Sequence, residues 1–511
     1  MASTFLVEMS NKSSTDALAA RSLYAPKAAE KRVETGARPV SIPFGRLFLP
    51  AVFFSWAAFT AWCVWGFPPP VDLPAHGAQL QTLVNLLRGD PAVSQIYEIH
   101  VPIGYGLVYW LFLPLAFATN GAVAVRVALW VALQLFPLSQ VALLRTFKRP
   151  DWLLLLGLPL AFNFSYWYGL LSGLFAQPLA FFTIALFQRA LESRRARLLI
   201  WVNVLAAATM QSHLVAFVAL VVAVIALAAC HSPRLESLKM AAVSLFLPIA
   251  ISIPKVWSMA VRAVTEGPWP ETHYGGISHL VWFFRNYRPE GFLAAWAPQL
   301  ITTLFVVLYL RRRRQEPIAP AAMFAALVLL YFITPKTLSG IFLISVRLPV
   351  LAAMVSLLMV SGDALNRPLR VAVLALSFAS LIQTAMFHHR FARAVDGLDK
   401  MIAGPPPKTH GYWSLAGREV LGSRMIYLEH LGQWLTAERG GVGHNFFADA
   451  EHHPVRFKPG RELPSSLVLA SPQELARFDQ ILLYGEGPLP WRLRGWREIA
   501  HAGLWRRLAR P

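Results

Sequence analysis

Residues 46–67 read RLFLPAVFFSWAAFTAWCVWGF, an apolar run whose one charge, Arg46, stands at its first position. A helix of about 20 apolar residues crosses the hydrocarbon core of a bilayer. The run therefore predicts a membrane-spanning helix. It starts too late and runs too long for a cleaved signal peptide, so we expect it to stay in the membrane.

Similar apolar runs follow as far as residue 387. They cover residues 101–119, 124–144, 152–170, 174–190, 198–212, 213–230, 240–259, 292–310, 320–334, 341–360 and 370–387. We interpret 101–119 as a re-entrant or interfacial helix on the outer side, because a span here would put the basic tail and the later basic loops on opposite sides. Pro102, Gly104 and Gly106 also disfavour a regular helix at its start. The sequence therefore predicts an α-helical polytopic membrane protein with about 11 transmembrane helices plus outer juxtamembrane helices.

The composition agrees with a membrane location. The 511 residues are 56% hydrophobic and only 14% charged, whereas soluble domains carry roughly 25% charged residues. This excludes a soluble enzyme, a disordered chain and a fibrous repeat. Cys63 and Cys230 both lie in apolar runs, so we expect packing thiols and no disulfide framework.

The Lys and Arg residues predict the orientation of the chain. Counted to residue 370, the amino-terminal tail and one set of alternate loops hold 22 of them, and the other loops hold 5. Cytoplasmic loops retain such residues, so we expect the amino terminus inside and the carboxyl terminus outside. The formal net charge of +20 then reflects membrane topology, and we expect no nucleic-acid partner.

Three parts follow one another along the chain. We expect a flexible cytoplasmic tail at 1–44, a transmembrane domain at 45–389 and a small α/β extracytoplasmic domain at 390–511. The transmembrane domain includes the first outer loop, 68–100, and the juxtamembrane helix at 101–119. In the last part, Gln480–Tyr484 predicts a buried strand and Leu431–Ala437 an amphipathic helix.

Acidic and imidazole side chains flank the first outer loop. The loop opens with PPPVDLPAH at 68–76, which places Asp72 and His76 on one helical face, and it ends near Glu98 and His100. Such groups suit general acid–base chemistry, with Asp72 and Glu98 as catalytic candidates and the histidines as substrate-binding candidates. The alternative is that Asp72 only caps a helix that begins before Pro74.

Basic side chains near the outer ends of later spans could bind a phosphate. His213 opens one span, Lys336 ends a short outer loop, and Arg347 lies six residues into its span. A cation at membrane depth suggests a functional partner, and phosphate is a natural partner of Arg. Snorkelling to the interface is the alternative, and we prefer it for Arg126.

The loop at 262–290 combines carboxylates with many aromatic residues. Trp269 and Glu271 suit stacking against a sugar and binding its hydroxyls, but an interfacial aromatic belt explains the composition equally well. His444, His452 and His453 lack a metal-ligand spacing, so we expect no metal site. The chain has no P-loop, dinucleotide-binding fingerprint or nucleophile elbow.

Taken together, these features resemble the GT-C superfamily of integral-membrane glycosyltransferases. The resemblance covers most of residues 45–390. It rests on the cytoplasmic amino terminus, the acid Asp72 at the start of the first outer loop, the Pro-Gly-Tyr-rich segment around Tyr105, and the carboxyl-terminal outer domain. Residues 72–76, DLPAH, also look like a stretch of uncharacterised bacterial members.

The resemblance implies an inverting hexosyl- or pentosyltransferase of a bacterial inner membrane with a periplasmic carboxyl-terminal domain. Its co-substrate would be a polyprenyl-phosphate-linked sugar and its acceptor a lipid, glycan or protein, with no bound cofactor and no sequence support for a divalent metal. Asp72 would take the acceptor proton, while Arg347 and His213 would bind the departing phosphate. Many members carry a second acid directly after the first; this chain has Leu73 there, and Glu98 is the substitute.

Two other functions stay open from the sequence. A membrane transporter or flippase would line a path with charges, although here the embedded charges gather near one face. A catalytically silent GT-C-like scaffold would use residues 390–511 to bind a partner.

Overall fold

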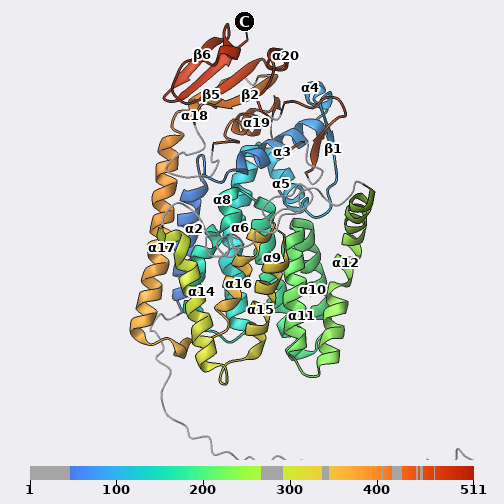
Figure 1. The fold of residues 1–511 in the computed structure, drawn as a ribbon, viewed down its shortest axis with the longest axis vertical. Helices are drawn as coiled ribbons and strands as arrows, with labels where there is room; N and C mark the ends of the chain where they lie inside the picture. The colour runs from blue at the N-terminus through green and yellow to red at the C-terminus, as the bar shows by residue number, and fades with distance from the viewer. Residues whose placement is uncertain are drawn as a thin grey trace, which may run out of the picture. The chain divides into compact units, whose positions relative to one another are not determined.

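The structure is a computed structural model that describes residues 46–265, 292–335, 344–404, 407–416, 428–444, 447–448, 453–464 and 466–510. The chain divides into two units, Met1–Pro50 and Ala51–Pro511, and the second contains nearly all of the described residues. Within that unit, long helices lie side by side and a small sheet stands at one end of them (Figure 1).

Apolar helices make up most of the second unit. The longer ones are α2 (Phe48–Val64), α3 (Leu73–Leu87), α5 (Leu107–Ala118), α6 (Gly121–Thr146), α9 (Leu171–Ser193), α10 (Ala196–Ser212), α11 (Leu214–Ala229), α12 (Arg234–Thr265), α14 (Phe292–Arg312), α15 (Ile318–Ile333) and α17 (Arg367–Ala394). Among the described residues, four helices are long and apolar enough to cross a membrane: α6, α9, the Arg234–Pro254 part of α12, and α17. The prediction of a polytopic helical membrane protein is confirmed.

The helices pack around α9, which contacts α6, α10 and α11. Most of α9 is buried inside the protein, whereas α12 and α17 bury only a minor part of their surface. Many of their exposed side chains are large and apolar, including Phe246, Phe378 and Ile382. Such a surface suits contact with lipid tails, since it would be unfavourable against water.

The predicted span at 152–170 is wrong in its form. The chain there makes four short pieces: η1 (Asp151–Leu153), α7 (Leu154–Gly157), η2 (Leu158–Phe162) and α8 (Phe164–Tyr168). Pro159 removes a backbone donor from the middle of the run, and Asn163 starts a new helix by accepting a hydrogen bond from the Ser165 backbone. Gly157 packs directly against Gln140, which donates to the Gly157 carbonyl at 2.9 Å.

The segment at 341–360 also departs from the predicted continuous span. Its described part contains η3 (Ser345–Arg347) and α16 (Pro349–Ser356), and 341–343 lie outside the described residues. Eight residues make a helix about 12 Å long, too short to cross a bilayer alone. The twelve residues of α5 span about 18 Å, and we keep its interfacial placement as a prediction.

The carboxyl-terminal segment forms a mixed five-stranded sheet in the order β3-β2-β5-β7-β6. Its strands are β2 (Thr409–Ser414), β3 (Val442–Gly443), β5 (Gln480–Tyr484), β6 (Arg497–Ala502) and β7 (Trp505–Ala509). β2 pairs in parallel with β3 and β5, while β7 pairs antiparallel with β5 and β6. Helices α18 (Leu398–Ile402), α19 (Gln433–Arg439) and α20 (Pro472–Leu475) accompany the sheet, which confirms the predicted strand at 480–484 and the small C-terminal α/β region.

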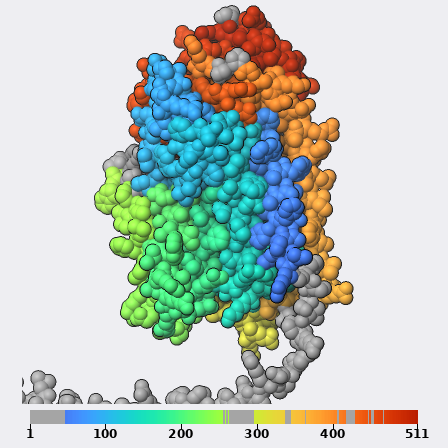
Figure 2. All heavy atoms as spheres, turned by 180° about the vertical axis from the view of Figure 1, so that it is seen from behind, coloured from blue at the N-terminus to red at the C-terminus, as the bar shows by residue number. Residues whose placement is uncertain are grey.

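The sheet shares its hydrophobic core with the first loop of the chain. Ala75, Ala78 and Leu83 of α3 pack in one cluster with residues of β2 and β5 such as Trp413 and Ile481. A second sheet joins β1 (Tyr97–Ile99) to β4 (Val455–Phe457) in antiparallel register. Figure 2 shows the first-loop residues directly against the carboxyl-terminal ones. The two segments therefore hold each other in place.

Buried polar contacts fix this arrangement. Gln79 on α3 exchanges two hydrogen bonds with the Val455 backbone, at 3.1 and 3.3 Å, and Tyr97 donates to the Gly443 carbonyl at 2.6 Å. A buried amide that pairs both its groups with one strand residue selects a single register. Contacts with the carboxyl-terminal segment thus fix the position of α3.

Arg126 does not snorkel as we preferred to expect. Its guanidinium pairs with Glu438 of α19 at 3.1 Å and lies 4.5 Å from the ring centroid of Trp434. Only 13% of the Arg126 side chain is exposed. The cation therefore joins α6 to the carboxyl-terminal segment, a partner that the local sequence does not show.

Candidate active site

Asp72 stands where the chain passes from the first loop into α3. Its backbone N–H donates to the Tyr168 carbonyl at 3.0 Å, and the N–H of Val71 donates to Trp167 at 3.2 Å. The turn after α8 presses against it: Gly169 has a left-handed φ of 81°, and an added Cβ would lie 2.5 Å from the Asp72 nitrogen. Only glycine meets both requirements, so the turn that ends α8 fixes the position of the Asp72 backbone.

The Asp72 carboxylate does not cap α3. Asp72 occupies the N-cap position, yet its side chain makes no capping hydrogen bond. Instead, Oδ1 lies 3.5 Å from Nε2 of His430, and both side chains are buried. The alternative that Asp72 is only a helix cap is therefore wrong.

Burial is the main cause that raises the Asp72 pKa well above its usual range. The negative charge of Glu429 raises this pKa further, and the positive charge of Arg347 lowers it. A carboxylate with a raised pKa is a stronger base once it is ionised. The same contributions show that Glu429 and Arg347 lie within electrostatic reach of Asp72.

Arg347 and His213 form a second polar group next to α8. Arg347 ends η3, which packs against α8, and its Nη1 lies 2.5 Å from His213 Nε2. His213 stands in extended backbone between α10 and α11, at the boundary of the runs predicted at 198–212 and 213–230. An added Cβ on Gly173 would lie 3.6 Å from the His213 ring. A half-buried arginine held by a histidine is suited to binding an anion.

The segment before α5 reaches the same place. The Tyr105 ring lies edge-on to His213 at 5.0 Å, and the Gly104 backbone donates to Gln211 at 3.2 Å. The Pro-Gly-Tyr-rich segment is thus part of the wall around His213.

His76 lies on α3 one turn after Asp72, and it belongs to a cluster of rings. Its Nδ1 hydrogen-bonds the Tyr109 hydroxyl at 2.5 Å, and the same hydroxyl contacts His453 Nδ1 at 2.9 Å. Phe447 stacks on His453 with centroids 4.9 Å apart and also contacts the His430 ring at 5.1 Å. We call His76, Tyr109, His453, Phe447 and His430 the ring cluster.

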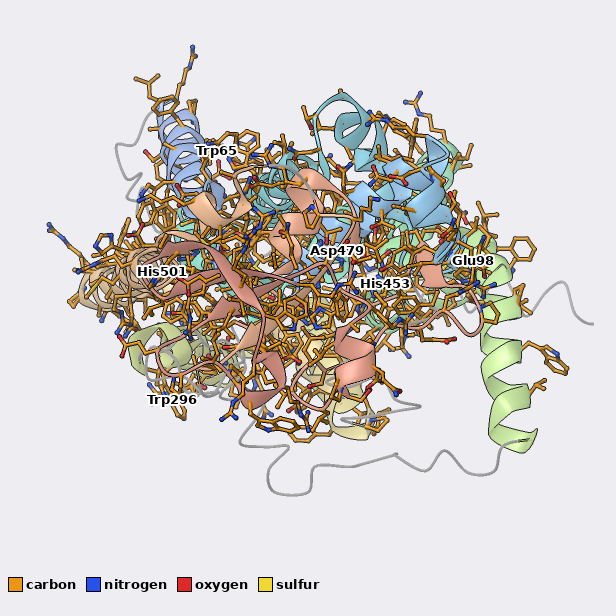
Figure 3. All side chains as sticks on the ribbon, turned by 90° about the horizontal axis from the view of Figure 1, so that it is seen from above. Trp65, Glu98, Trp296, His453, Asp479 and His501 are labelled. Atoms are coloured by element: carbon orange, nitrogen blue, oxygen red, sulfur yellow. The ribbon has the colours of Figure 1, made fainter. Side chains whose placement is uncertain are left out.

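The structure brings some predicted site residues together and separates others. Asp72, His76, His213 and Arg347 gather around α8 and the start of α3, as described above. Glu98 instead pairs with Arg456 across the β1–β4 sheet at 2.6 Å, where 33% of its side chain is exposed. Figure 3 shows it at the periphery of the view.

Of the four remaining predicted site residues, one follows β1 and three lie outside the described residues. His100 follows β1 and donates its backbone N–H to Pro454 at 2.8 Å. Lys336, Glu271 and Trp269 lie outside the described residues. Within the described part of the chain, no group of three or more His, Cys, Asp or Glu side chains is arranged to hold a metal ion.

Sequence reasoning missed the contributions of the carboxyl-terminal segment. His430 and Glu429 act on Asp72 from the far end of the chain, and Tyr109 and Tyr168 lie close enough for the Asp72 charge to affect their titration. The one local signal is that Glu429 and His430 are adjacent polar residues between Leu428 and Leu431. Such a pair is too common to identify a site.

Comparison with solved structures finds one similar protein of note, ArnT from Cupriavidus metallidurans bound to undecaprenyl phosphate. It superposes with a TM-score of 0.51 at 12% sequence identity, over 91% of this chain and 98% of that one. No family model matches the chain, and no curated protein matches it. The likeness establishes the fold: the chain has a helical membrane fold similar to that of this ArnT structure.

Proposed function

We propose that this GT-C-like protein is a membrane glycosyltransferase that moves a sugar from a polyprenyl-phosphate-linked donor to an acceptor hydroxyl. The observation that carries the proposal is the Asp72 carboxylate, which is buried, makes no cap hydrogen bond and lies within electrostatic reach of Arg347. A buried base within electrostatic reach of a cation would supply the two groups that the reaction needs. The fold is shared with a protein whose structure contains undecaprenyl phosphate, which supports this class of donor.

In the proposed reaction, Asp72 removes the proton of the acceptor hydroxyl. The acceptor oxygen bonds to the anomeric carbon of the sugar while the bond from that carbon to the phosphate oxygen breaks on the opposite face. This single displacement inverts the anomeric centre. Arg347, held by His213 at 2.5 Å, stabilises the negative charge that the phosphate gains as it leaves.

We further propose that Asp72 acts without Glu98. Glu98 is engaged by Arg456 on the β1–β4 sheet, whereas Glu429 lies within electrostatic reach of Asp72. The orientation inferred from the basic loops would place this chemistry on the outer face of a bacterial inner membrane. The assay below tests which lipid-linked sugar serves as donor.

The test uses purified protein and a panel of polyprenyl-phosphate-linked hexoses and pentoses. Release of polyprenyl phosphate is measured, because it reports transfer to an added acceptor and to water alike. We expect Asp72→Asn to lower the rate by about 10²-fold or more, since a positioned general base typically contributes 10²–10⁴.

Asp90→Asn is the matched control. Asp90 lies in the same loop and caps α4 (Pro91–Ser94) through two backbone hydrogen bonds, a role that asparagine fills equally well. Unchanged release by Asp72→Asn would refute the assignment of the base. Movement of a lipid-linked sugar across proteoliposomes with no release by the wild type would instead favour a flippase.

A further inference from the structure

The position of the Asp72 carboxylate needs an explanation beyond its proposed chemistry. An aspartate at an N-cap normally accepts a hydrogen bond from the first turn of the helix, where the helix dipole also attracts negative charge. Asp72 forgoes this bond. Its backbone lies in the helical region, with φ −87° and ψ −4°, whereas a capping residue is usually extended, so its side chain does not reach the first turn. The described partner of its Oδ1 is His430.

The His430 ring belongs to a series of contacts that leads back to α3. Its ring contacts Phe447, Phe447 stacks on His453 at an interplanar angle of 13°, and His453 shares the Tyr109 hydroxyl with His76. His76 follows Asp72 by one turn of α3 and donates its backbone N–H to the Asp72 carbonyl at 3.1 Å. The ring cluster thus begins and ends on the same face of α3.

Phe447 supports this view through its backbone. Its φ is 66°, a left-handed value that bulky side chains rarely adopt. Such a conformation persists where the surroundings fix it, and it is found mainly at functional sites. Here it places the aromatic ring between His430 and His453.

We propose that His430 is a positioning residue for Asp72, supplied by the carboxyl-terminal segment: its Nε2 holds the Asp72 carboxylate in the orientation in which it meets the acceptor. This inference rests on the proposed function. It assigns the carboxyl-terminal segment a role in the chemistry. Without His430, the carboxylate would lose this contact and its reactive orientation.

The 3.5 Å separation is longer than a good hydrogen bond. Contacts of this kind often shorten when the substrate binds. Imidazole and carboxylate are both buried, so a bond formed there would be strengthened by the low polarity of the site.

Two variants separate positioning from structure. His430→Gln keeps a side-chain N–H donor, and His430→Leu replaces the ring with an apolar group of similar size. We expect His430→Leu to lower kcat by about 10²-fold, the loss typical of a misplaced reacting group, while KM for the donor changes by less than about twofold. We expect His430→Gln to recover kcat to within about tenfold of the wild type.

His501→Leu is the matched control. His501 lies 3.5 Å from Glu498, the same separation, but this pair is exposed on β6. It should leave kcat and KM unchanged. Wild-type kcat in His430→Leu, or equal losses in both His430 variants with KM rising in step, would overturn the proposal.

A second measurement does not depend on activity. The melting temperatures of wild type, Asp72→Asn, His430→Leu and the double variant form a thermodynamic cycle. We expect the double variant to depart from the sum of the single effects, because each change acts through the same contact. Additive effects would overturn the inference even if no donor were found. Conversely, full activity of Asp72→Asn would refute the proposed base, whereas an inactive Asp72→Asn with an active His430→Leu would refute only the role of His430.

Discussion

Two buried histidines make the carboxyl-terminal segment sensitive to acid. His410 on β2 shares a hydrogen bond with the Thr436 hydroxyl of α19 at 2.8 Å, and His444 Nδ1 accepts from the Tyr412 backbone at 3.3 Å. Burial is the main cause that lowers the pKa of each to about 3. Because α19 packs on α3, protonation of either histidine would loosen α3, which begins directly after Asp72.

The magnitude follows from proton linkage. Each folded-state pKa is depressed below the ordinary value of 6.5, so the unfolded chain takes up the protons first and stability falls as the pH falls below 6.5. Between pH 7 and pH 5 the loss is about 2 kcal/mol for each histidine, or about 4 kcal/mol for both. This free-energy loss depends on the pKa of the histidine in the unfolded chain. It is nearly the same for any folded-state pKa well below 5.

The assay is reversible unfolding in mixed detergent micelles, followed at pH 7 and pH 5. His410→Gln keeps an acceptor for Thr436 but cannot be protonated, so its loss of unfolding free energy on acidification should be smaller than that of the wild type by about 2 kcal/mol. His501→Gln, at an exposed position, should behave as the wild type does. Identical pH dependence in His410→Gln and wild type would refute the reasoning.

Two further predictions concern charge. Since Glu429 raises the Asp72 pKa, Glu429→Gln should lower that pKa and move the acid limb of the pH–rate profile to lower pH; a limb that stays in place would contradict the electrostatic assignment. Arg149 and Glu316 form an ion pair at 3.2 Å with only 7% and 4% of their side chains exposed, so Glu316→Gln should cost about 3–5 kcal/mol of unfolding free energy. Glu236→Gln, which breaks an exposed pair, should cost less than about 1 kcal/mol, and equal losses in the two variants would count against the burial argument.

The sequence predicted helices well where an apolar run is continuous. The runs at 124–144, 174–190 and 370–387 correspond to α6, α9 and α17. It failed at 152–170, where the mean hydropathy of the run is high but Gly157, Pro159 and Asn163 interrupt it. Hydropathy measures transfer to lipid, whereas a helix also needs an unbroken series of backbone hydrogen bonds.

The site was predictable only in its local part. Asp72 and His76 are four residues apart and could be placed on one helical face from the sequence alone. The contacts from His430 to Asp72 and from Glu438 to Arg126 join distant parts of the chain. No periodicity or spacing records such contacts, because they depend on how the carboxyl-terminal sheet docks on α3.

Asp72 is proposed to carry the chemistry and Arg347 to bind the donor, and one measurement separates these roles most directly. It is the binding of undecaprenyl phosphate to purified Asp72→Asn, made on the same sample whose release rate is measured. We expect binding to stay within about threefold of the wild type while release falls by about 10²-fold or more. Loss of both binding and release, or retention of both, would contradict this division of roles.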